Sequence, residues 1–183
     1  MKRREAIQLT ATLMGGTIIG SEVFLSGCRN STPQKSLISE NDIALLDEIG
    51  ETILPETADS PGAKAAKIGN FMKAIVMDCY SMEEQQIFLS GLANINRLSI
   101  ENYESEFPNL TASDKVTFIH GLEQEALADK SGQPHYINMI KQLTLWGYFT
   151  SEPGATQALR YNPVPGRYIG CIPYKKGDKA WAE

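Results

Sequence analysis

Apolar residues recur at helical spacing through most of the chain. Ile43, Leu46, Ile49 and Ile53 follow one another at intervals of three or four residues, and Pro55 ends this series. A second series opens at Ile68 and continues at offsets 3, 4, 7, 8 and 11, so that its last member is Cys79. Such spacing places apolar side chains on one face of an α-helix. We therefore predict one helix from Ser39 to about Pro55 and another that ends near Cys79.

Polar residues mark where further helices begin. Ser39 with Asp42, and Ser81 with Glu84, have the spacing of a capping box, in which the first side chain accepts from the third backbone N–H of the helix. The second box predicts a helix to about Ile100. Its expected buried residues are Phe88, Leu92 and Ile95.

Two more helices are predicted before Thr150. Either Thr111 or Ser113 caps the first, and the second runs from about His135 to Phe149. The apolar residues expected inside are Val116, Ile119, Leu122 and Ala126 in the first helix and Ile137, Ile140 and Leu143 in the second. The predicted fold class is therefore all-α: a single helical-bundle domain of about five helices over residues 39–160.

The pattern changes after Thr150. One short helix is predicted from Pro153 to Leu159, and residues 161–183 then follow neither the helical nor the strand period. This segment is rich in Pro and Gly but keeps aromatic residues, in which disordered tails are usually poor. We predict an extended C-terminal arm that packs either on another protein or on the helices of its own domain.

The N-terminal segment is predicted to be an export signal over residues 1–27. Lys2, Arg3 and Arg4 precede an apolar stretch that contains too many Thr, Gly and Ser residues for a permanent transmembrane helix. The pair Arg3–Arg4 is similar to a twin-arginine signal. The alternative is an ordinary basic start of a secretory signal.

Cys28 ends this segment in the sequence LSGC, which resembles the lipobox of bacterial lipoproteins. A thiol at this position accepts a diacylglyceryl group, and two or more acyl chains hold a protein at a membrane. We therefore expect Cys28 to be lipidated and to begin the mature chain. Residues 28–38 would be a polar tether, and the protein would be periplasmic and anchored to the membrane.

Charge and cysteine content restrict the mature chain further. Without residues 1–27 it has 156 residues, with 14 of the 17 basic and 20 of the 22 acidic ones. The acidic balance and the lack of an evident basic patch make nucleic acid an unexpected partner. Cys79 and Cys171 remain after lipidation of Cys28. Either they form a disulfide, which an oxidising compartment permits, or Cys79 is a buried free thiol.

Catalytic motifs are missing from the sequence. It has no Gly-rich dinucleotide or phosphate loop, no haem attachment motif and no nucleophile elbow. The two histidines, His120 and His135, are interpreted as an edge-of-core and an exposed residue. We therefore expect no catalytic, cofactor-binding or metal-ligating residue in this chain.

Three stretches resemble a known family. They are Ile53–Met72, Asp78–Leu92 and, above all, Leu143–Pro173, which contains GYFTSEPG from Gly147 and YNPVPGRY from Tyr161. On these stretches the chain resembles subunit 3 of gluconate 2-dehydrogenase, over most of its mature length.

The resemblance implies a function that needs no catalytic residue here. Members of that family are small, helical, exported subunits that accompany a large FAD-dependent dehydrogenase of the glucose–methanol–choline type, which acts on sugars or sugar derivatives. They are thought to carry the export signal for that flavoprotein. A cytochrome c with haem often accepts the electrons in a third subunit. The lipobox departs from many members, so Cys28 can take over the anchoring role given elsewhere to the cytochrome.

The resemblance implies a partner, and the aromatic residues of the C-terminal segment offer a surface for it. We expect the flavoprotein to contact the segment from Gly147 to Trp181 through these residues, because aromatic side chains dominate binding energy at interfaces. The candidates are Tyr148, Phe149, Tyr161, Tyr168 and Trp181. Two other functions stay open: a free-standing lipoprotein that binds a small ligand or an envelope protein, and an enzyme with an unrecognised site.

Overall fold

The computed structural model describes residue 4 and residues 37–164, 166–167 and 170–182. The chain divides into two units, residues 1–36 and residues 37–183. Arg3, Cys28 and Tyr168 lie outside the described residues, and Arg4 is exposed. The second unit begins earlier than expected, because Ile38 is buried in its core rather than part of a tether.

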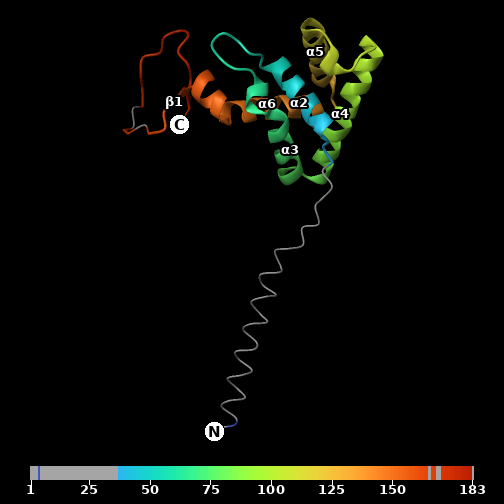
Figure 1. Cartoon of the computed structure of the whole chain (residues 1–183), viewed down its shortest axis with the longest axis horizontal. Helices are drawn as coiled ribbons and strands as arrows, with labels where there is room; N and C mark the ends of the chain where they lie inside the picture. The colour runs from blue at the N-terminus through green and yellow to red at the C-terminus, as the bar shows by residue number, and fades with distance from the viewer. Residues whose placement is uncertain (1–3, 5–36, 165, 168–169, 183) are drawn as a thin grey trace. The chain divides into compact units, whose positions relative to one another are not determined.

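The second unit is helical, as predicted (Figure 1). Its α-helices in the described residues are α2 (Glu40–Ile53), α3 (Ile68–Cys79), α4 (Met82–Tyr103), α5 (Ala112–Ala128) and α6 (Tyr136–Thr150). Short turns of tighter or wider helix lie between or after them: η1 (Ala63–Ala66), η2 (Phe107–Asn109) and η3 (Gly154–Ala158). Among the described residues no helix is both long and apolar enough to span a membrane.

The predicted caps set the helix starts. Both capping boxes form, with Ser39 and Asp42 at α2 and with Ser81 and Glu84 at α4. Thr111 rather than Ser113 caps α5, because its hydroxyl accepts from the backbone N–H of Asp114 at 3.2 Å. His135 is half-buried rather than exposed, and its Nδ1 accepts from the N–H of Ile137 at the start of α6. These bonds satisfy N–H groups that have no partner within the helix.

The core contains nearly all of the predicted apolar residues. Those of α4 and α6 are buried as expected, and so are Ile68, Met72 and Val76 of α3. Val116 of α5 is instead 57% exposed, and Phe118 takes its place in the core. Phe118 packs on the rings of Phe107 and Tyr103, at 5.5 and 6.1 Å between centroids. This contact turns α5 so that His120 is exposed and does not border the core.

A glycine allows α2 and α3 to approach closely. A Cβ atom on Gly69 would lie 2.4 Å from the backbone oxygen of Ile43. The N–H of Gly69 donates to Asp47 Oδ1 at 2.8 Å, which gives a partner to a free donor at the start of α3. Backbone and side chain of α2 therefore both fix the position of α3.

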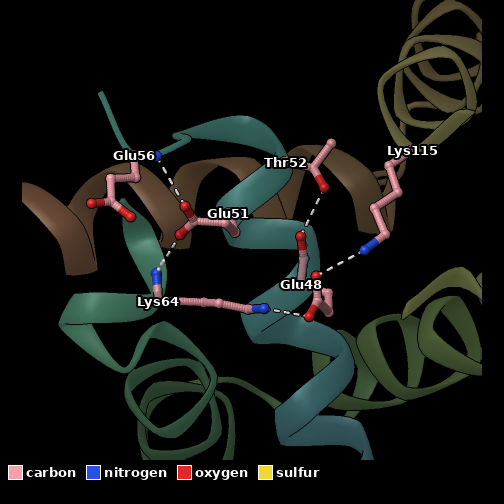
Figure 2. Close-up of polar contacts among 6 residues, drawn as sticks. All are labelled: Glu48, Glu51, Thr52, Glu56, Lys64 and Lys115. Carbon is pink, nitrogen blue, oxygen red and sulfur yellow. Dashed lines mark hydrogen bonds and ion pairs between the residues drawn. The ribbon is translucent and has the colours of Figure 1, made fainter. Parts of the chain in front are cut away.

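Carboxylates of α2 hold the loop that follows it (Figure 2). Glu51 accepts from the backbone N–H groups of Glu56 and Lys64, each at 2.9 Å. Glu48 pairs with Lys64 and, at 2.9 Å, with Lys115 of α5. Burial would raise the pKa of Glu48, but its bonds to Lys64 and Lys115 outweigh this and lower the pKa below its ordinary value. The loop is thus fixed on α2, and Glu48 connects it to α5.

The two cysteines depart from both expectations. Cys79 and Cys171 are free thiols, and both are exposed. The structure therefore contains neither the disulfide nor a buried thiol at Cys79. The apolar stripe of α3 ends at Val76, because Cys79 lies in the last turn, where the helix leaves the core.

Candidate partner interface

Every buried side-chain nitrogen or oxygen of the described residues has a hydrogen-bond partner. No group of three His, Cys, Asp or Glu side chains in residues 37–182 as described could hold a metal ion. Large apolar side chains do lie exposed on the described surface, and such side chains are candidates for contact with another protein.

Half of the GYFTSEPG motif serves the fold itself. A Cβ atom on Gly147 would lie 2.5 Å from Phe71, so α3 and α6 need a glycine there to pack closely. Ser151 Oγ donates to the carbonyl of Tyr148 and accepts from the N–H of Gly154 at 3.2 Å. These contacts turn the chain back on the end of α6 and so position η3 and the arm.

Tyr148 is wrong as a candidate for partner contact. Its side chain is only 3% exposed, and its hydroxyl donates to the carbonyl of Pro61. The same hydroxyl lies 2.5 Å from Ser60 Oγ. Tyr148 therefore fixes the loop after α2 against α6 and is not available to another protein.

Three apolar side chains beside Tyr148 on α6 are exposed. Leu145, Trp146 and Phe149 are all exposed in the described structure, with Trp146 at 57%. Residues three and four apart are neighbours on a helix surface, so these side chains form one patch, which we call the α6 apolar face. Phe149 was expected from the sequence, whereas Leu145 and Trp146 were missed. The sequence feature that could have indicated Trp146 is its position directly before Gly147, the first residue of the GYFTSEPG stretch.

The arm forms a closed loop instead of a free extended segment. Its ends pair in parallel as β1 (Arg160–Tyr161) and β2 (Trp181–Ala182). The N–H of Arg160 donates to Ala180 and that of Asn162 to Ala182, both at 2.8 Å. The guanidinium of Arg160 stacks 4.0 Å from the centroid of Trp181, an arrangement that attracts a cation to the ring.

The arm does not cover the helices of its own domain. Every described residue from Pro163 to Trp181 is exposed, and so are the expected contact residues Tyr161 and Trp181. The ammonium group of Lys179 donates a hydrogen bond to the carbonyl of Gln157, which lies in η3. Between η3, β1 and the returning arm lies an open groove of about 660 Å³. The described arm is thus held at its base and free of cover along its length.

Comparison with known proteins gives one match. The family model described as gluconate 2-dehydrogenase subunit 3 matches residues 40–166. No curated protein and no solved structure matches the chain. The matched range includes all five described α-helices and the α6 apolar face, and it ends before most of the arm.

Proposed function

Because the match covers more than half of its length, the chain belongs to the gluconate 2-dehydrogenase subunit 3 family, and from this membership we propose that it is a non-catalytic subunit of a periplasmic dehydrogenase complex. Its partner would be an FAD-dependent flavoprotein of the glucose–methanol–choline type that oxidises a sugar or sugar acid. The small subunit would assist export, stability and membrane attachment of that flavoprotein.

The exposed α6 apolar face is the observation that supports this proposal best. Gly147, Tyr148 and Gly154 of the GYFTSEPG stretch have contacts within the domain that account for them, whereas Trp146 is 57% exposed and Phe149, whose ring meets only the edge of Tyr148 among the described rings, is exposed as well. Large aromatic side chains that lie together on a surface typically mark a protein contact. The face also lies inside the matched range, as a surface for a shared partner should.

We expect Trp146→Ala with Phe149→Ala to abolish capture of the flavoprotein. Truncation of an aromatic residue at the centre of an interface typically costs about 2 kcal/mol or more, or about thirtyfold in Kd. The measurement is purification of the tagged full chain from membranes in mild detergent, followed by FAD absorbance and sugar-dependent dye reduction in the captured fraction. Circular dichroism should stay unchanged, because neither side chain is in the core.

A matched control separates this effect from a general loss of apolar surface. Val116 and Leu127 are exposed apolar residues of α5, and Val116 has the same exposed fraction as Trp146. Val116→Ala with Leu127→Ala should leave capture intact. If a flavoprotein is captured equally by both double variants, the α6 apolar face is not the docking site. If the wild-type chain captures no flavoprotein, the proposed function itself fails.

Membrane attachment has a separate test at Cys28. Cys28→Ala should leave the mature protein unlipidated and removable from membranes by washing, since two or more acyl chains are needed for stable anchoring. Mass spectrometry of the wild-type mature N-terminus measures the modification directly. An unmodified N-terminal peptide that contains Cys28 would contradict the lipid anchor without affecting the partner proposal.

A further inference from the structure

The arm and the helical body carry opposite charge. Counted from Arg160, where β1 begins, the arm contains five basic and two acidic residues, whereas residues 37–159 contain seven basic and 18 acidic ones. All five basic residues of the arm are exposed: Arg160, Arg167, Lys175, Lys176 and Lys179. The unequal distribution means that an anionic surface would attract the arm and repel the body.

The tip of the arm, residues 172–178, contains a turn and carries both cationic and apolar side chains. The N–H of Lys175 donates to the carboxylate of Asp178 at 2.9 Å, and the N–H of Asp178 donates back to the carbonyl of Lys175 at 3.0 Å. Gly177 provides the left-handed backbone, with φ of 97°, that this turn requires. Beside it Tyr174 is 76% exposed, and Ile172 is exposed as well.

We propose that this arm docks on the surface of an anionic phospholipid bilayer. Tyr and aliphatic side chains enter the headgroup region of a bilayer, and neighbouring Lys and Arg side chains pair with anionic headgroups. The tip offers this combination on a narrow turn. The proposal goes beyond the accessory-subunit function, because residues 167–183 lie outside the matched family range.

A lipid surface fits the arm better than the acidic face of another protein. A stable protein interface buries about 800 Å² on each partner in a closely packed patch. The described tip residues instead lie in a single loop in which every residue is exposed. A bilayer needs no shape complementarity, and its negative charge would also turn the acidic body away from it. The arm would thus orient the domain on the membrane.

The test uses residues 37–183, which form a compact unit separate from residues 1–36. This fragment lacks the apolar signal segment and Cys28, so neither can cause binding. It should bind vesicles of phosphatidylcholine mixed with phosphatidylglycerol, bind pure phosphatidylcholine vesicles far more weakly, and dissociate at high salt. Each lysine near an anionic surface changes affinity by about fivefold. Lys175→Gln with Lys176→Gln should therefore weaken binding about 25-fold.

The control changes the same net charge on the body. Lys67 and Lys130 are exposed residues outside the arm, and Lys67→Gln with Lys130→Gln should leave vesicle binding nearly unchanged. The proposal is overturned if both double variants lose vesicle binding equally. It is also overturned if the wild-type fragment binds neutral and anionic vesicles equally, or binds neither. A third outcome is that the wild-type fragment binds no vesicles and that Lys175→Gln with Lys176→Gln loses flavoprotein capture. That outcome overturns the lipid proposal and assigns the arm to the protein interface. The α6 double variant tests the proposed function independently of these outcomes.

Discussion

Gly69→Ala is expected to destabilise the helical domain by about 1–3 kcal/mol, the usual range for an overpacked contact. The added methyl group would lie 2.4 Å from the backbone oxygen of Ile43, well inside van der Waals contact. A side chain could rotate away, but the carbonyl belongs to the ordered helix α2 and cannot move without it. The substitution would therefore push α3 from α2 and weaken the bond from Gly69 N–H to Asp47.

Gly121→Ala is the matched control for this prediction. Gly121 lies inside α5, and nothing is within 4 Å of where its Cβ would be. Alanine there should stabilise the protein by about 0.5–1 kcal/mol, because glycine loses more backbone entropy in a helix. Urea unfolding followed by circular dichroism measures both variants. A Gly69→Ala protein as stable as Gly121→Ala would show that the close contact between α2 and α3 is wrong.

Local sequence features were sufficient to predict the helices. Ser39, Ser81 and Thr111 act through backbone groups three residues away, so the capping pattern contains nearly all the information it needs. The burial of Phe88, Ile95 and Ile140 follows from helical spacing for the same reason. These predictions were confirmed because the interactions that decide them lie within one helix.

Contacts between distant segments could not be read from the pattern. Phe118 is buried in place of Val116 because the rings of Phe107 and Tyr103 lie beside it, and nothing in the spacing of α5 indicates those neighbours. The sequence predicts Tyr148 as a contact residue because it begins an aromatic-rich segment that continues without helical or strand period. Its partner is the carbonyl of Pro61, which is 87 residues away.

The candidate interface was predicted only in part, also for a physical reason. The sequence shows that the arm has aromatic residues without periodicity, and in the structure Tyr161 and Trp181 are indeed exposed. The parallel pairing of β1 with β2 was missed because a two-residue strand has no period to detect. Trp146 was missed because an exposed residue inside an apolar helix looks the same as a buried one until its neighbours are known.

The largest functional effect is expected from Arg3→Lys with Arg4→Lys in the full precursor. Lysine keeps the charge but lacks the planar, forked guanidinium, so a receptor that recognises the arginine pair should reject the variant. Under the proposed function, the flavoprotein folds around FAD before export and leaves the cytoplasm bound to this chain. Both proteins should then remain in the cytoplasm, and periplasmic dehydrogenase activity should be lost.

Cell fractionation with antibodies to both proteins measures this outcome, and Cys28→Ala is its control. That variant should still carry the flavoprotein across the membrane, because lipidation follows export and the arginine pair is intact. Three results are informative. Export of both proteins by the Lys–Lys variant would indicate an ordinary secretory signal. Export of the flavoprotein alone would remove the shared-export role while leaving docking at the α6 apolar face to its own test. Retention of both, with export restored by the wild-type precursor, is the result that the proposal requires.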